Sequence, residues 1–161
     1  MTHPTKIDLA DNVRQESISL LNARLAEAID LQLQTKQAHW NVKGPSFIAL
    51  HELFDEVSEN VEKYVDLIAE RATLLGGTAL GTIQVVAKHS QLPAYPLYIT
   101  AGRDHVDALS TVLASFGKAA RAAIDQAEGL GDADTADVFT EISRAVDKDL
   151  WFVEAHVQAD R

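Results

Sequence analysis

The sequence predicts an all-α protein built as a four-helix bundle. Its 161 residues suffice for one domain that buries its own core. Ala and Leu are frequent, whereas Gly and Pro, which interrupt helices, number only 8 and 4. Long stretches also place apolar residues every three or four positions, the spacing of a helix with one buried face. We therefore expect a single domain over residues 1–161.

The first two predicted helices are neighbours joined by a tight connection. The first runs from about residue 6 to residue 41, and its apolar stripe turns polar towards His39. Gly44-Pro45 breaks it, and a second helix follows from about residue 46 to residue 75, where Gly76-Gly77 ends it. So short a connection makes the two helices antiparallel.

A long connection separates this pair from a second pair. We expect a short helix near residues 82–89 and then turns at Pro93 and Pro96. The third long helix spans about residues 100–127 and the fourth about residues 134–157, with glycines between them. Two short connections around one long crossover give the ferritin-like form of the four-helix bundle.

Composition limits the chemistry and the location. The chain has no cysteine, which excludes disulfides and thiolate metal sites. The remaining donors, carboxylate oxygens and imidazoles, suit iron, manganese or zinc. The N-terminus is polar, and no apolar run approaches the roughly 20 residues of a membrane span. We therefore expect a cytoplasmic protein with no membrane partner.

The formal net charge of −10 argues against nucleic acid as the default partner, because phosphate contacts need clustered Lys and Arg. An acidic surface is suited to attracting cations. It also keeps a soluble protein dispersed, and the net charge fits both interpretations equally well.

The second predicted helix carries a set of potential metal ligands. At roughly 100° per residue, His51, Asp55, Asp66 and Glu70 fall on one face. However, Asp66 lies roughly 22 Å along the axis from His51, too far for both to bind one ion. An antiparallel partner related by a two-fold axis would bring its own Asp66 and Glu70 opposite His51 and Asp55. The pattern predicts two equivalent iron sites, each shared between two chains.

His39 is the remaining candidate donor. It ends the polar part of the first helix, and the break at Gly44-Pro45 can bring His51 near it. A lone histidine on such a face is more often a satisfied core residue than a ligand. Two histidines beside carboxylates spaced four apart favour the metal site.

These residues resemble the Dps mini-ferritins, a family named as DNA-binding proteins from starved cells. The histidine spacing combined with Asp-x-x-x-Glu is more specific than any one part of the pattern. The matching residues are Lys36, His39-Trp40-Asn41, Gly44, Phe47, Leu50-His51, Phe54-Asp55, Asp66, Ala69-Glu70-Arg71 and Leu75-Gly76-Gly77, and matches continue at 79–82, 95–97, 134–137 and 147–152.

The resemblance implies a function. Family members form hollow twelve-subunit cages that oxidise Fe(II), preferably with hydrogen peroxide, and store ferric mineral, with ferroxidase sites at two-fold interfaces. Transferred to this chain, the pattern makes His39 with the partner's Asp66 and Glu70 the tighter iron site. His51 and Asp55 then complete a second, weaker site, and Glu70 can bridge the two irons. The resemblance thus implies a ferroxidase with a di-iron centre.

Residues around the ligands have two interpretations each. Lys36 is either a partner for a site carboxylate or a solvated lysine. Trp40 either walls the site and quenches radicals or simply packs. The remaining histidines show no ligand spacing and are interpreted as ordinary polar residues: His3, His89, His105 and His156.

Two further groups of carboxylates also have two interpretations each. The family places a three-fold pore for Fe(II) near the start of the fourth helix, where acids also cap the helix: Asp132, Asp134 and Asp137. A second group either faces the cage interior and nucleates mineral or forms an ordinary wet helix face: Glu52, Glu56 and Glu59.

Two other classes of protein are alternatives. A self-contained di-iron enzyme needs Glu-x-x-His motifs on two helices, and the chain has none. A non-catalytic DNA-compacting cage protein should have a basic arm. Before the first helix the only basic side chain is Lys6, with Arg14 just inside it, so we expect weak DNA binding.

Overall fold

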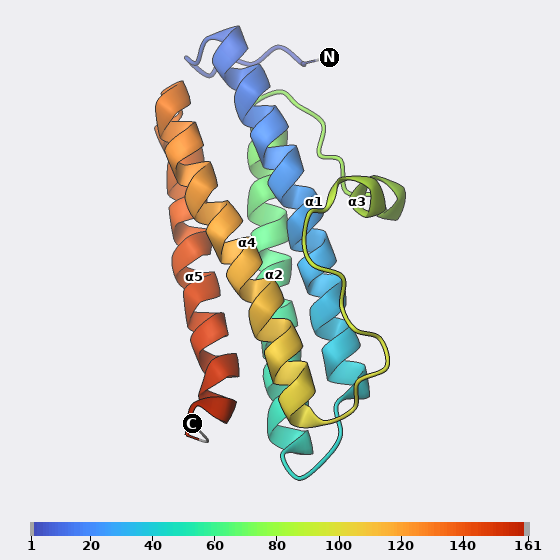
Figure 1. Ribbon diagram of the computed structural model, residues 1–161. Helices are drawn as coiled ribbons and strands as arrows, with labels where there is room; N and C mark the ends of the chain where they lie inside the picture. Colours follow the sequence, from blue (N-terminus) through green and yellow to red (C-terminus); the bar gives the residue numbers. More distant parts are fainter. Residues whose placement is uncertain (1, 160–161) are drawn as a thin grey trace.

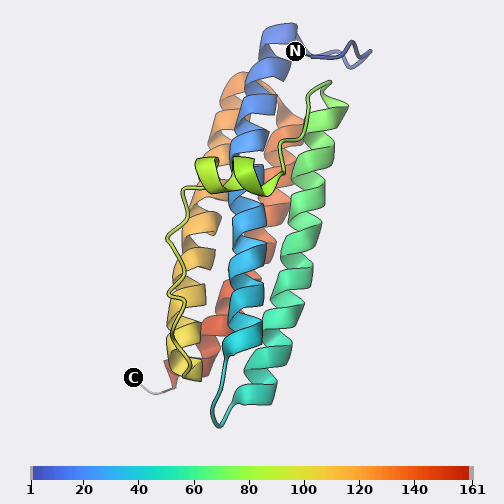
Figure 2. The ribbon, with the colours of Figure 1, turned by 90° about the vertical axis from the view of Figure 1, so that its right-hand side faces the viewer.

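The computed structural model describes residues 2–159 and confirms the all-α bundle. Four long helices pack side by side, and one short helix lies outside them (Figures 1 and 2). None of these helices is long and apolar enough to cross a membrane. The helices are α1 (Asp11–Asn41), α2 (Phe47–Leu74), α3 (Ile83–His89), α4 (Gly102–Leu130) and α5 (Ala133–Gln158).

The core follows from the predicted apolar stripes. α1 pairs with α2 and α4 pairs with α5, and α1 also packs on α4 (Figure 1). Large side chains from several helices meet in the centre and are fully buried, among them Leu25, Phe54, Phe116 and Phe139. Burying such side chains contributes about 1.5–3 kcal/mol each, so the stripes determine which faces meet.

The first helix begins at Asp11 rather than near Lys6, because the preceding segment is used elsewhere. The N–H of His3 donates to the carbonyl of Gly76 at 2.7 Å, so the N-terminal segment lies across the end of α2. A Cβ on Gly76 would lie 2.4 Å from the His3 carbonyl oxygen, and Gly76 also has φ of +88°. Glycine is therefore required at this crossing.

The turn between the last two helices also differs from prediction. α4 continues through Gly129 to Leu130, and Gly131 ends it with φ of +80°, the left-handed cap. α5 then begins at Ala133 with Asp132 as its N-cap, whose carboxylate accepts from Thr135 N–H at 3.1 Å. The predicted capping by an acid is confirmed at this position.

The crossover returns to the α1–α2 turn. It includes α3, inside the predicted range of 82–89, and then runs down the outside of the bundle to α4 (Figures 1 and 2). The N–H of Lys43 donates to the Thr100 carbonyl at 2.9 Å, and Lys43 pairs with Ala101 as an isolated parallel bridge. The end of the crossover is thus fastened beside the turn that joins the two histidine-bearing helices.

Candidate metal site

The two predicted imidazoles lie against each other. The rings of His39 and His51 stack with centroids 3.8 Å apart and planes 19° from parallel. Nδ1 of His39 is 2.7 Å from the His51 carbonyl oxygen, and Nδ1 of His51 is 2.9 Å from the His39 carbonyl oxygen. A carbonyl can only accept, so each Nδ1 carries the hydrogen and donates it. Both Nε2 atoms keep a free lone pair for a metal.

The chain produces this pair through its turn. His39 is in the last turn of α1 and His51 in the second turn of α2. Gly44 between them has φ of +114°, which a glycine adopts without strain. The antiparallel return predicted from Gly44-Pro45 therefore does bring the histidines together.

Asp55 lies one turn beyond His51 and already has a cationic partner. The ammonium of Lys36, from α1, forms an ion pair with the Asp55 carboxylate. This hydrogen bond holds the pKa of Asp55 below its usual value. Lys36 thus contacts a predicted ligand, in agreement with the first of its two interpretations.

Asp66 and Glu70 lie further along α2. Both are exposed, and neither carboxylate has a partner among residues 2–159. Helix geometry separates Asp66 from His51 by roughly 22 Å. Within the described part of one chain, no three His, Asp or Glu side chains converge to hold a metal. The predicted ligands of one chain therefore lie in two separate groups, which we call the imidazole half (His39 and His51) and the carboxylate half (Asp66 and Glu70).

One aromatic side chain contacts the imidazole half, and a second is adjacent to it in the sequence. The Phe47 ring lies 5.0 Å from that of His51, and Trp40, next to His39, is 66% exposed. Trp40 is therefore not part of the core of its own chain. Its large exposed ring is available to an adjacent molecule or to a reactant at the site.

The three acids at the start of α5 have different environments. Asp132 is 1% exposed, and Arg71 donates to it at 2.7 Å while the Thr135 hydroxyl donates at 2.7 Å. Burial alone would raise the pKa of Asp132, but hydrogen bonds from Thr135, Ser17 and Arg71 outweigh it and lower the pKa. Asp132 is thus committed within its own chain, whereas Asp134 and Asp137 are exposed.

The acids predicted as possible nucleation residues all face outward from the bundle core. Glu52, Glu56 and Glu59 are exposed on α2, and none forms an ion pair among the described residues. They remain available to cations.

His105 and Asp149 are among the buried polar groups that the sequence analysis missed. The interpretation of His105 as an ordinary polar residue is wrong: it is 1% exposed, with Nδ1 2.8 Å from the Tyr95 hydroxyl. Its position four residues before Leu109 on the apolar stripe was the available signal. Asp149 is also buried, where Tyr64 donates to it at 2.8 Å and Asn60 at 2.9 Å. Burial raises the pKa of Asp149.

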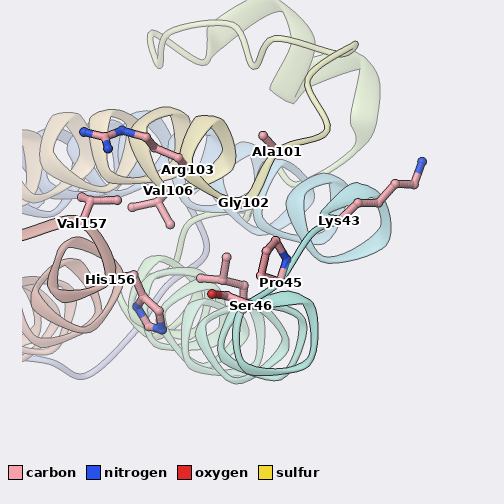
Figure 3. Close-up of a pocket in the computed structure, with 10 residues that line it drawn as sticks. Lys43, Pro45, Ser46, Ala101, Gly102, Arg103, Val106, His156 and Val157 are labelled. Atoms are coloured by element: carbon pink, nitrogen blue, oxygen red, sulfur yellow. The ribbon is translucent and has the colours of Figure 1, made fainter. Parts of the chain in front are cut away.

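A cavity of about 300 Å³ lies at the end of the bundle where α1 turns into α2, but it is separate from the predicted ligands. It lies between the α1–α2 turn and the facing ends of α4 and α5 (Figure 3). None of the five predicted ligands lines it, and Lys43 and Arg103 extend away from its centre (Figure 3). The cavity is not the metal site.

The fold and the separated groups of potential ligands define a class of protein, a four-helix bundle with imidazoles near one end of a helix pair and unpaired carboxylates further along it. A ferritin-like domain matches residues 18–161. The DNA protection during starvation protein of Agrobacterium fabrum is 51% identical over 157 residues, with 98% of this chain and 97% of that protein covered. This chain belongs to the Dps family of ferritin-like proteins, as its motif indicated.

Solved structures support the same assignment. The Dps of Mycobacterium smegmatis superposes with a TM-score of 0.92 at 33% identity, covering 98% of this chain and 94% of that one. The Dps of Microbacterium arborescens in its high iron form superposes with a TM-score of 0.86 at 33% identity, covering 92% and 96%. Iron chemistry and iron storage are therefore the activities to test on this chain.

Proposed function

We propose that the protein is a ferroxidase that oxidises Fe(II) at di-iron sites shared between two subunits and stores the ferric product in a hollow cage. The observation that carries the proposal is the division of ligands in one chain. The Nε2 lone pairs of His39 and His51 are free. Asp66 and Glu70, on the same helix as His51, have no partner among the described residues. Isologous contact of two such chains makes two equivalent sites.

Each residue has a role in this proposal. His39 with the partner subunit's Asp66 and Glu70 binds the first Fe(II). His51 and Asp55 bind the second, and Lys36 must leave Asp55 as the ion arrives. Hard carboxylate oxygens favour Fe(III) over Fe(II), so oxidation is downhill. Two Fe(II) ions supply both electrons to one hydrogen peroxide, giving two Fe(III) and two hydroxide ions without releasing a hydroxyl radical.

Assembly and storage extend the proposal beyond the site. We expect a dodecamer in the cytoplasm, with Fe(II) entering past Asp134 and Asp137 and mineral nucleating near Glu52, Glu56 and Glu59. Several large apolar side chains that a single chain leaves exposed support burial between subunits. They include Ile48, Leu74, Leu80, Ile83, Leu97 and Tyr98.

Subunit mixing tests the shared site. His51→Ala and Asp66→Ala chains should each form inactive cages, as should the double variant. At a mixed interface both changes fall on one site and leave the other intact. Equal mixing of the single variants should therefore restore about a quarter of the sites. Initial rates of Fe(II) oxidation that stay at the average of the two single variants would rule out the shared site.

The oxidant is tested separately by stoichiometry and spin trapping. Paired irons should consume about two Fe(II) per peroxide and suppress the hydroxyl-radical adduct relative to free Fe(II). A radical yield equal to that of free Fe(II) would show that the paired irons do not protect the cell from oxidative damage, while leaving the proposed iron binding untouched. Size-exclusion chromatography of each variant checks that the cage still assembles.

The alternative is a non-catalytic cage that compacts DNA. The name of the Agrobacterium relative refers to DNA protection. With a net charge of −10 per chain, binding to plasmid at micromolar cage in magnesium-free buffer should be absent. Appending a lysine-rich arm should create binding that weakens steeply with salt. Tight, salt-sensitive binding by the unmodified protein would favour the alternative.

A further inference from the structure

The end of the crossover is fastened to the turn that carries the imidazole pair. The Lys43–Thr100 hydrogen bond joins the α1–α2 turn to the segment just before α4. Figure 3 shows Ala101 beside the turn that carries Lys43. Lys43 is four positions after His39, so release of this segment would loosen the backbone next to the site.

One buried hydrogen bond holds the segment from inside. Tyr95, in the crossover, and His105, in the first turn of α4, are both buried, and the Tyr95 hydroxyl lies 2.8 Å from Nδ1 of His105. The backbone of Ile99 and of Asn41 borders the ring. His105 therefore stands where the crossover, the end of α1 and the start of α4 meet.

The surroundings define a neutral ring. Among the described residues Nδ1 of His105 is the one hydrogen-bond partner of the Tyr95 hydroxyl, so Nδ1 accepts the O–H, and the hydrogen of the neutral ring lies on Nε2, which is buried without a hydrogen-bond partner there. A second proton, on Nδ1, would point at the Tyr95 oxygen and force the hydroxyl hydrogen to find another acceptor in a buried place. Protonation is thus incompatible with the hydrogen bond as it stands.

Little charge is present to offset a cationic ring. On α4 the neighbouring Asp104 is the one carboxylate, among the described residues, that favours the charged form, and it is exposed. The crossover contributes the Tyr95 hydroxyl and the backbone of Ile99, and the end of α1 contributes the backbone of Asn41, none of them charged. The other charged side chains close by in the α1–α2 turn and in α4 are Lys43 and Arg103, and both are cationic. Burial dominates and lowers the pKa of His105.

We propose that Tyr95 and His105 form an acid-sensitive latch that fastens the crossover to the α1–α2 turn and so holds the imidazole half of the site. The latch is closed while His105 is neutral. Because the open state takes up a proton at the ordinary histidine pKa of about 6.5 and the closed state does so only at lower pH, acidification favours opening. The latch belongs to the iron-free chain, and only its effect on iron rests on the proposed function.

Hydrogen exchange of the assembled, iron-free protein tests the latch. Peptides covering residues 38–46 and 94–103 would be followed by mass spectrometry, with rates corrected for the intrinsic pH dependence of exchange. Between about pH 7.5 and 5.5 their opening should increase by up to about tenfold, since one proton is taken up on opening. Peptides from the middle of α4 should show no such change.

Three variants separate the latch from general acid sensitivity. His105→Asn keeps an oxygen that can accept from Tyr95 but cannot be protonated, so the acid-induced increase should disappear. His89→Asn, at an exposed histidine of α3, should retain it. Tyr95→Phe should open both peptides already at neutral pH.

Several outcomes would overturn the latch. Exchange that does not depend on pH in the unmodified protein would do so, as would an increase that persists in His105→Asn. If His105→Asn fails to fold, the pH series of the unmodified protein and of Tyr95→Phe still decides. No iron is present in these measurements, so their result does not depend on whether the protein is a ferroxidase.

Discussion

The two halves of the proposed site are held in different ways. The imidazole half is fixed within its own chain, because His39 and His51 each donate to the other's carbonyl. The carboxylate half is not fixed in this way, because Asp66 and Glu70 are exposed. Of their neighbours, Arg71, which follows Glu70, is anchored by its ion pair with Asp132. The chain therefore positions the backbone of the carboxylate half but leaves its ligands to be organised by another molecule.

This difference supports the proposal that the site is shared between two chains. In that proposal a face with unpaired carboxylates meets a face with free imidazole nitrogens on a second copy. It also predicts that substitutions in the two halves affect stability and activity differently, which the following experiments test.

The largest effect on stability is expected at the anchor of the carboxylate half. Asp132→Ala removes the cap of α5 and leaves the mostly buried Arg71 without its closest partner. Breaking a buried ion pair costs about 3–5 kcal/mol, measured as the free energy of unfolding in urea. Asp137→Ala, at an exposed acid of α5 that forms no ion pair among the described residues, should change it by less than about 0.5 kcal/mol. Equal losses would mean that the buried pair is not the anchor.

Loss of a carboxylate ligand should affect activity without affecting stability. Asp66→Ala is expected to lower the initial rate of Fe(II) oxidation by at least about 100-fold, since losses of residues that only support ligands already reach 10- to 100-fold. The free energy of unfolding should stay within about 0.5 kcal/mol, as at other exposed positions. Glu62→Ala, one turn before Asp66 and also exposed, is the matched control and should keep full activity.

Loss of an imidazole should affect both the rate of Fe(II) oxidation and the stability of the protein. His51→Ala removes a ligand and also the hydrogen bond that its Nδ1–H donates to the His39 carbonyl. We expect a similar loss of oxidation together with a loss of about 1–2 kcal/mol in the free energy of unfolding. His89→Ala, at an exposed histidine, controls for the residue type. Unchanged stability in His51→Ala would show that the reciprocal bonds contribute nothing.

The smallest effect concerns Lys36. Its ammonium competes with a metal for Asp55, and a pair this exposed contributes at most about 1 kcal/mol. Lys36→Met should therefore strengthen divalent-cation binding at the weaker position by up to about fivefold, as measured by calorimetry with Zn(II). The same substitution raises the pKa of Asp55 towards its usual value. Lys63→Met, elsewhere on α2, should leave affinity unchanged.

Much of the site was predictable because it depends on helix periodicity. The common face of His51, Asp55, Asp66 and Glu70 follows from their spacing, and the approach of His39 follows from the break at Gly44. The reciprocal ring-to-carbonyl bonds were not predictable, because they depend on how closely the ends of two helices approach. The assignment of these residues to iron remains a prediction.

Tertiary contacts explain where the sequence analysis was wrong or incomplete. The start of α1 shifted to Asp11 because residues before it cross Gly76, a contact between positions far apart in the chain. His105 and Asp149 were not recognised as buried because their partners, Tyr95 and Tyr64, are on other elements. Asp132 was predicted as a cap, but its burial beneath Arg71 required the packed bundle.

The stacked histidines also affect the entropy of binding. Each imidazole lost its rotational freedom when the chain folded, so an arriving ion need not immobilise it again. Asp66 and Glu70 are still free to rotate, and ordering such side chains costs about 0.5–1.5 kcal/mol each. Of the four groups, the carboxylates would therefore carry the entropic cost of closing the site around iron.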